Sequence, residues 1–219
     1  NEMSDGRFRL GLGVSHGPVT DRLGVETGKP LADTASYVAA MRANERFGGQ
    51  LPPIYLATLR NKMLQLATDI SEGAIWANAS LSHMAQQLSE IPNAVRDDFF
   101  LANMIPTVID DDVEAARAVN RRTLTGYVSL PNYRNYWRAA GYVEEMDAIE
   151  AAIEAGNKDI LPSLMSDKWL DDNTISGSAS HVRARFEEWA HAGVTPIAVM
   201  SSTTGGQVKA INQLFDVYN

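Results

Sequence analysis

Two polar residues with catalytic potential follow an apolar stretch near the start of the chain. Ser15 and His16 come directly after residues 8–14, in which Gly13 is the second of two glycines. An imidazole has an unperturbed pKa of about 6.5, so His16 at the end of a strand is a candidate general acid near neutral pH. The alternative interpretation is a loop histidine without a role.

A second set of polar residues follows the apolar run 54–57. Ala57, Thr58 and Leu59 lead into Arg60, Asn61 and Lys62, where a helical pattern begins. Free backbone N–H groups and the dipole of a helix N-terminus favour a bound phosphate, and the two basic side chains add positive charge. Helix capping by Thr58 or Asn61, with both basic side chains in solvent, is the alternative.

A third set begins at Trp76. Ala77, Asn78 and Ser80 follow it closely, so this segment offers an aromatic ring, a hydrogen-bonding amide and a helix start. Trp76 lies within the strand pattern, which favours core packing for its ring. We therefore expect Asn78 to be the binding residue.

Other polar groups are interpreted as structural. The acidic runs 110–112 and 171–172 lack the spacing of a calcium-binding loop, and helix capping explains them. His83, His181 and His191 have no metal-ligand spacing and are expected at the surface, so no metal site is predicted. The chain has no cysteine, which excludes disulfides, thiolate metal sites and a cysteine nucleophile.

A nucleic-acid partner is not expected. The 19 Lys and Arg residues against 27 Asp and Glu residues give a formal net charge of −8, whereas polyanion binding draws on clustered positive charge. The aromatic and basic stretch 133–138, with Arg121 and Arg122 upstream, is better interpreted as a helical cap whose aromatic rings line an apolar substrate pocket. Plain packing is the alternative of equal weight.

Composition predicts a folded chain. The sequence has 219 residues, of which 45% are hydrophobic and 21% are charged, so we expect a single domain over residues 1–219 with a packed core. No apolar run reaches the roughly 18 residues of a membrane span, and the polar residues 1–7 do not resemble a signal peptide. A cytoplasmic location is the expectation.

Apolar runs alternate with helical patterns along the chain. This alternation predicts an α/β fold with a parallel sheet covered by helices. An irregular, aromatic-rich helical insertion is expected at about residues 126–175, before the last strand. The expected strands are 8–14, 54–57, 74–77, 99–109 and 196–200, and the expected helices are 31–43, 61–70, 81–91, one starting near Asp111 and Glu114, one capped by Ser178, and one from Gln207.

Two architectures accommodate five such strands: an open doubly wound sheet, or part of a (β/α)8 barrel. Gly6 to Val14 (GRFRLGLGV) resembles the fourth strand of the luciferase-like monooxygenase family. Residues 52–57 with 63–67 are similar to its fifth strand and helix, residues 72–75 to its sixth strand, and residues 175–178 to its late Gly-Ser helix start. The branch it most resembles uses the deazaflavin coenzyme F-420.

The resemblance implies an incomplete TIM-type barrel of strands four to eight, without a counterpart of the first three. It also implies an oxidoreductase that moves a hydride between reduced F-420 and a small organic substrate, with a homodimer as a possible assembly. An FMN-dependent monooxygenase of the same fold and a non-catalytic flavin-binding protein remain alternatives. The implied site places Gly13, Ser15 and His16 near the coenzyme ring, with His16 catalytic, residues 57–62 at the phosphate, and Ala77 and Asn78 beside it.

Overall fold

A computed structural model describes residues 2–92, 95 and 97–218 of the chain. The first of the polar residues 1–7 therefore lies outside the described residues. The chain forms two compact units, in which the first comprises the residues up to Ala77 together with Gln86–Ala102, and the second comprises Asn78–Ala85 together with the residues from Asn103 on. In the described residues no helix is both long and apolar enough to cross a membrane.

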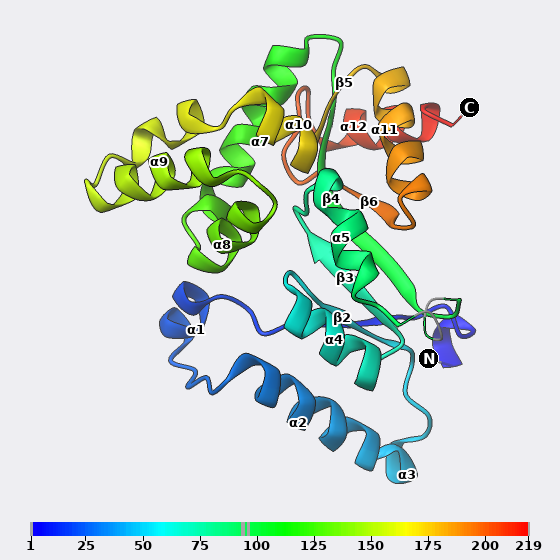
Figure 1. The fold of residues 1–219 in the computed structure, drawn as a ribbon. Helices are drawn as coiled ribbons and strands as arrows, with labels where there is room; N and C mark the ends of the chain where they lie inside the picture. The colour runs from blue at the N-terminus through cyan, green and yellow to red at the C-terminus, as the bar shows by residue number, and fades with distance from the viewer. Residues whose placement is uncertain (1, 93–94, 96, 219) are drawn as a thin grey trace. The chain divides into compact units, whose positions relative to one another are not determined.

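The first unit is built on three parallel strands. β1 pairs with β2, and β2 pairs with β3, with Leu12 opposite Leu56 and Leu56 opposite Ala74. The helix α4 packs on β2 and β3, and α2 packs on α4 (Figure 1). The elements of this unit are η1 (Glu2–Ser4), β1 (Leu10–Leu12), α1 (Gly17–Leu23), α2 (Pro30–Ala43), α3 (Glu45–Gly48), β2 (Ile54–Ala57), α4 (Asn61–Ile70) and β3 (Gly73–Ala77).

The interior of the first unit follows the helical and strand periodicities. The inward positions of α4 and β2 are fully buried, as are Ala74 and Trp76 of β3. The predicted core role of Trp76 is thereby confirmed. Gly73 begins β3 at a point where a side chain has no room, because an added Cβ would lie 2.6 Å from the carbonyl oxygen of Phe100.

The second unit combines short strands with the helical insertion. β4 pairs with β5 in parallel, with Thr107 opposite Ile175, and β6 also pairs with β4. The elements α5 (Met84–Ser89) and β4 (Phe100–Ile109) run from one unit into the other. The remaining elements are η2 (Leu81–His83), α7 (Val113–Val128), α8 (Pro131–Ala139), α9 (Val143–Glu154), η3 (Lys158–Leu164), α10 (Asp167–Asn173), β5 (Ile175–Gly177), α11 (Ala179–His191), β6 (Thr195–Val199) and α12 (Gln207–Asp216).

The parallel α/β class is confirmed, and the five predicted strands correspond to β1, β2, β3, β4 and β6. The expectation that the insertion directly precedes the last strand is wrong. Ile175 begins the short strand β5, so two strands follow the insertion instead of one. A three-residue strand is too short to show a period of two, which is why the pattern along the chain did not reveal it. Closure into a barrel and the single-domain organisation stay predictions.

Two helices differ from the prediction, one in its capping residue and one in its continuity. The cap of α7 is Asp112 and not Asp111, since the Asp112 carboxylate accepts the N–H of Ala115 at 3.1 Å. The predicted helix 81–91 is divided into the 3-10 turn η2 and the short helix α5. Ser178 caps α11 as predicted, because its hydroxyl accepts the N–H of His181.

Candidate functional site

The loop after β1 has a constrained backbone at the predicted residues. Ser15 has a φ of +62°, and it is one of only three non-glycine residues with positive φ in the described part of the chain. Such a conformation costs a non-glycine residue on the order of 1 kcal/mol and is found preferentially at functional sites. Gly13 lies close to the end of β2, since a Cβ added there would be 3.0 Å from the Cβ of Ala57. His16 follows as the N-cap residue of α1 and is partly exposed.

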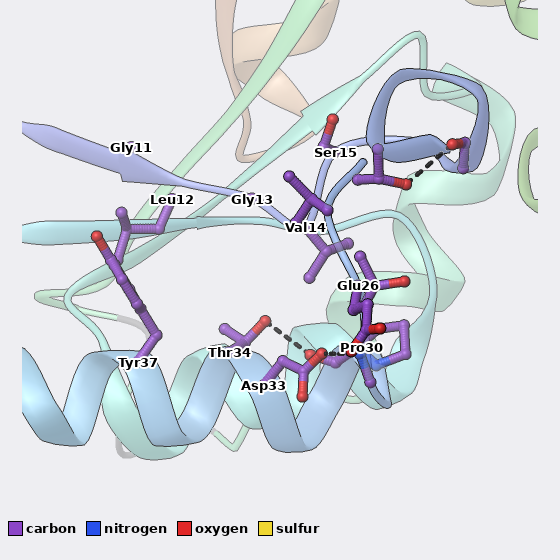
Figure 2. A pocket seen from close by; sticks show the side chains of 15 residues that line it. Gly11, Leu12, Gly13, Val14, Ser15, Glu26, Pro30, Asp33, Thr34 and Tyr37 are labelled. Atoms are coloured by element: carbon purple, nitrogen blue, oxygen red, sulfur yellow. Dashed lines mark hydrogen bonds between the residues drawn. The ribbon is translucent and has the colours of Figure 1, made fainter. Parts of the chain in front are cut away.

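A cavity of about 620 Å³ lies in the first unit beside this loop (Figure 2). Gly13 and Ser15 line it, whereas the other predicted site residues are not among its lining residues within the described chain. Sequence reasoning missed its other polar residues, among them Glu26 in the loop before α2 and Asp33 and Thr34 in the first turns of α2. Pro30 at the start of α2, with an acidic residue three positions on, was the available signal for a helix start there.

The end of β2 carries a buried hydroxyl with no partner. The backbone N–H of Thr58 donates to the carbonyl of Ile75 at 2.9 Å, which extends the β2–β3 pairing by one residue. Its side chain is only 4% exposed, and Oγ1 makes no hydrogen bond to any described residue. Because a buried hydroxyl without a partner is costly, this atom is a candidate to bind a ligand or a water molecule.

The N-terminus of α4 is open. Arg60 is its N-cap residue in an extended conformation, and no side chain caps the helix. Capping by Thr58 or Asn61, the alternative raised from the sequence, is therefore wrong. Arg60 and Lys62 are exposed and make no ion pair with a described residue. The first turn thus presents free N–H groups and two positive charges beside the Thr58 hydroxyl, which is the arrangement that binds a phosphate.

Asn78, the first residue of the second unit, stands in a left-handed conformation with a φ of +57°. Its backbone N–H donates to the carbonyl of Met104 at 3.0 Å, and its carbonyl accepts the indole N–H of Trp137 at 3.2 Å. The side chain is 3% exposed, and its Nδ2 has no partner among the described residues. The backbone is thereby fixed on both sides while the amide stays available as a donor.

The next two residues are held by side chains from distant elements. The N–H of Ala79 donates to Oδ1 of Asn103 in β4 at 3.3 Å, and the N–H of Ser80 donates to the hydroxyl of Tyr136 in α8 at 3.0 Å. The Ser80 hydroxyl donates to Oδ1 of Asn173 at 2.6 Å. Ser80 precedes the helical turn η2 as its N-cap residue, but its side chain makes no capping hydrogen bond.

The aromatic residues of the insertion form packing contacts inside the second unit. Trp137 packs edge-on against Trp169 with ring centroids 4.8 Å apart, and Tyr133 packs against Trp137 at 5.4 Å. All three rings, and that of Tyr136, are buried. Burial raises the pKa of Tyr136 well above its ordinary value, so its hydroxyl stays protonated. These contacts favour the packing interpretation over a cap that lines a substrate pocket.

His83 is not the surface residue that was predicted. It is partly buried, and its ring lies edge-on to Tyr136 with centroids 5.7 Å apart. Burial lowers the pKa of His83, and the negative charge of Asp172 opposes that shift by a smaller amount. His181 and His191 are exposed, as predicted.

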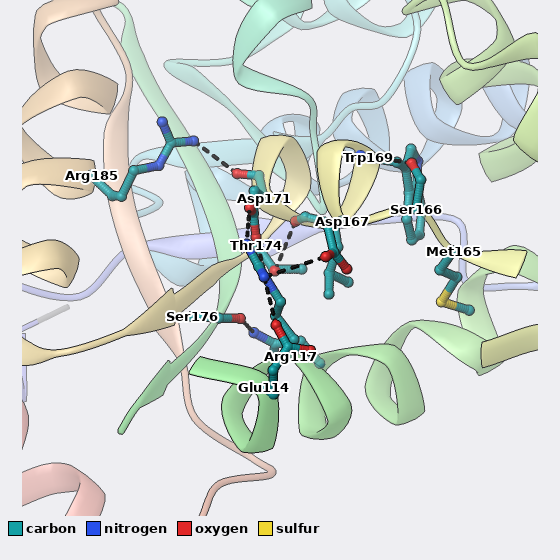
Figure 3. A network of polar contacts seen from close by, with 12 residues as sticks. Glu114, Arg117, Met165, Ser166, Asp167, Trp169, Asp171, Thr174, Ser176 and Arg185 are labelled. Carbon is teal, nitrogen blue, oxygen red and sulfur yellow. Dashed lines mark hydrogen bonds and ion pairs between the residues drawn. The ribbon is translucent and has the colours of Figure 1, made fainter. Parts of the chain in front are cut away.

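The two acidic runs differ in role: Asp112 of the run 110–112 caps α7, as capping predicts, whereas the run 171–172 pairs with side chains of other elements. Asp171 receives two hydrogen bonds from the guanidinium of Arg117, at 3.0 and 2.6 Å, and this pair connects α10 to α7 (Figure 3). Asp172 accepts from the hydroxyls of Ser82 at 2.7 Å and Tyr142 at 2.8 Å. In the described residues no group of three potential metal ligands is found.

The basic side chains of the stretch 133–138 are paired with carboxylates. Arg134 donates to Glu150 at 2.8 Å and to the carbonyl of Val128 at 2.9 Å, and Arg138 pairs with both Glu150 and Asp147. The Arg134 guanidinium, followed by that of Arg138, lowers the pKa of Glu150. These ion pairs connect α8 to α9, so the two arginines do not form a basic surface.

Comparisons with known proteins define the class. The model of the luciferase-like monooxygenase family matches residues 1–196. The chain belongs to the luciferase-like monooxygenase family, and the expectation of an enzyme of this family is confirmed.

Relatives of known activity are similar over nearly the whole chain. A 5,10-methylenetetrahydromethanopterin reductase of Methanolobus tindarius is 26% identical over 238 residues, which cover 96% of this chain and 73% of the relative. The enzyme of the same name from Archaeoglobus fulgidus is 25% identical over 244 residues, with 96% and 72% covered.

Solved structures share the fold. The coenzyme F-420-dependent tetrahydromethanopterin reductase of Methanopyrus kandleri has a TM-score of 0.75 at 18% identity, and the match covers 97% of this chain and 73% of that one. An F-420-dependent secondary alcohol dehydrogenase, in complex with an F-420–acetone adduct, has a TM-score of 0.69 at 16% identity, with 97% and 69% covered.

Proposed function

We propose that this protein is an oxidoreductase that uses the deazaflavin coenzyme F-420 to transfer a hydride to or from a small organic substrate. Family membership and the two reductase relatives support the reaction class. The single observation that carries the proposal is the open N-terminus of α4 beside the buried, unpartnered hydroxyl of Thr58.

The residues at this end of the first unit fit the phosphate of such a coenzyme. The Thr58 hydroxyl and the free N–H groups of the first turn of α4 would hold the phosphate, and Arg60 and Lys62 would balance its negative charge. The backbone at Leu59 is held in place, because its carbonyl accepts a hydrogen bond from Nε2 of Gln87 at 3.0 Å. The proposed contact set is thus mainly backbone, with charge supplied from the exposed side chains.

The proposed ring contacts come from the loop after β1. Gly13 leaves room where a side chain would contact Ala57, and the strained Ser15 presents its hydroxyl and the following His16. His16 is proposed to hold or release a proton at its imidazole. Ala77 leads from β3 into Asn78, whose buried amide offers an N–H donor to a hydrogen-bond acceptor.

When bound, the deazaflavin supplies the hydride chemistry, and the chain supplies binding, orientation and electrostatics. In this proposal Thr58, Arg60 and Lys62 fix the position of the phosphate. In the first unit the left-handed backbone at Ser15 orients the hydroxyl of the loop after β1. His16 supplies or takes the proton that balances the reaction at the substrate.

The proposal is tested by titrating the protein with oxidised F-420 and, separately, with FMN, following cofactor fluorescence and tryptophan quenching. We expect F-420 to bind and FMN to bind much more weakly. Preferential binding of FMN would instead support the flavin monooxygenase of the same family. If the folded protein binds neither F-420 nor FMN, both enzyme hypotheses are refuted.

Variants locate the phosphate contact. Thr58→Val keeps the shape of the side chain and breaks no hydrogen bond to a described residue, so we expect unchanged thermal stability with F-420 affinity reduced about tenfold or more. Arg60→Gln and Lys62→Gln should weaken binding more at low salt than at high salt. Arg46→Gln is the matched control, since Arg46 is also exposed in the first unit but lies over the ring of Phe47. Equal losses in the control would exclude a specific site.

A further inference from the structure

The cavity beside β1 has an apolar wall and a polar end (Figure 2). Leu12, Val14, Val25 and the ring of Tyr37 supply apolar surface. At about 620 Å³ the cavity has the size of sites that hold small organic molecules. A ligand there would place an apolar body against these side chains.

The polar end is acidic. Glu26 and Asp33 line the cavity, and none of the described lining residues is a lysine, arginine or histidine. Glu26 makes no hydrogen bond or ion pair with a described residue. The charge of its carboxylate is therefore not balanced within the cavity.

Asp33 is held in a fixed orientation by its surroundings. Its Oδ2 accepts the backbone N–H of Gly28 at 2.8 Å, and the residue lies in the first turn of α2, where the helix dipole stabilises a negative charge. An added Cβ at Gly28 would be 2.6 Å from Oδ1 of the same carboxylate, so the loop backbone at Gly28 packs closely against the Asp33 side chain. The cavity thus carries a positioned negative charge and a second, unpaired one.

In the first unit, the basic side chains at α4 and the acidic side chains of the cavity lie at different places. Arg60 and Lys62 stand at the open N-terminus of α4, whereas the charged residues among the described lining of the cavity beside β1 are both carboxylates. Like charges at short range repel, and two carboxylates at the end of a partly enclosed cavity disfavour an anionic ligand there. The phosphate of an anionic coenzyme is directed to α4 and not to Glu26 and Asp33, which leaves the acidic end of the cavity for a different molecule.

We propose that the cavity beside β1 binds the substrate and that this substrate is a small organic molecule with an apolar body that is uncharged or carries an amine, not a carboxylate or a phosphate. The identification of the ligand as substrate rests on the proposed function. The charge preference rests on Glu26 and Asp33 alone. The amine or hydroxyl of the ligand lies at the two carboxylates, and its apolar part contacts Leu12, Val14 and Tyr37.

Three probes of one shape and different charge test the proposal: benzylamine, benzyl alcohol and benzoate, measured by ligand-observed NMR without coenzyme. We expect benzylamine to bind more tightly than benzyl alcohol, and benzoate to bind at least about tenfold more weakly than benzylamine. Glu26→Gln should reduce the preference for benzylamine over benzyl alcohol by about threefold. Tyr37→Ala should weaken all of the binding, because the exposed ring is a wall of the cavity and is not part of the core.

Glu90→Gln is the control for the loss of one negative charge, since Glu90 is exposed and does not line the cavity. Benzoate binding as tightly as benzylamine would overturn the proposal, and so would an unchanged order in Glu26→Gln, no effect of Tyr37→Ala, or no binding of any probe. A coenzyme titration of the same variants keeps the two proposals apart. If the unaltered protein binds no F-420 but keeps the expected probe order, only the proposed function is refuted; if it binds F-420 but lacks the expected probe order, only the substrate class is refuted.

Discussion

The indole N–H of Trp137 donates to the backbone carbonyl of Asn78 at 3.2 Å, across 59 positions of sequence. The same N–H donates to Oδ1 of Asn173 at 2.8 Å. A residue of the helical insertion thus holds the turn that follows β3, in which Asn78 has its left-handed backbone. The insertion supports a predicted binding residue by packing and hydrogen bonding.

Trp137→Phe tests this relationship. The change removes the indole N–H and its two acceptors lose a partner, so we expect the free energy of unfolding to fall further than the loss of ring volume alone explains. Trp169→Phe is the matched control, because Trp169 is equally buried but its Nε1 has no partner among the described residues. Urea denaturation should show Trp137→Phe to be less stable than Trp169→Phe by about 1–2 kcal/mol. Equal stabilities would mean that the hydrogen bonds contribute nothing.

Gly73→Ala should destabilise the first unit. The added Cβ would lie 2.6 Å from the carbonyl oxygen of Phe100 and 2.8 Å from the ring of Tyr55, and a backbone oxygen in a strand cannot move aside cheaply. We expect a loss of about 1–3 kcal/mol in thermal or urea denaturation. Gly11→Ala is the control in another strand of this unit, since a Cβ there meets nothing within 4 Å and should change stability by less than about 0.5 kcal/mol. A stable Gly73→Ala variant would show that β3 lies farther from Phe100.

Stability should depend on pH through His83. Burial holds the pKa of this imidazole below its ordinary value of 6.5, so near that pH the unfolded chain binds a proton that the folded chain does not. The stabilising effect of the neutral ring is therefore complete above pH 6.5 and is lost as pH falls below it. His83→Gln should flatten this part of the profile, measured as melting temperature between pH 5 and 8. A slope that persists in His83→Gln belongs to another group.

Replacing Arg134 and Arg183 in turn compares the ion pair of a buried arginine with that of an exposed one. The Arg134 side chain is 7% exposed and also bonds the carbonyl of Val128, whereas the Arg183 side chain is 53% exposed and bonds Glu187 one turn away. We expect Arg134→Met to lower the free energy of unfolding by about 2–3 kcal/mol and Arg183→Met by less than about 0.5 kcal/mol. Similar effects would indicate that Arg134 is hydrated in solution.

Local patterns predicted most of the elements of this fold. The strand 54–57 and the helix 61–70 have the predicted bounds, because strand and helix periodicities depend on residues close in sequence. The same patterns placed Ser15, Thr58 and Asn78 at strand ends. Two of these three have positive φ, and the third has an unpartnered hydroxyl, features that no sequence period encodes.

The sequence by itself determined the α/β class, the order of the five predicted strands, and the family resemblance that the comparisons confirm. Only the tertiary structure decided that Trp137 and Tyr136 hold the turn at residues 78–80, that His83 is partly buried, and that Glu26 and Asp33 meet at one cavity. The reason is physical. Periodicity reports which face of an element is buried, whereas side-chain partners separated by tens of residues are set by how the elements pack.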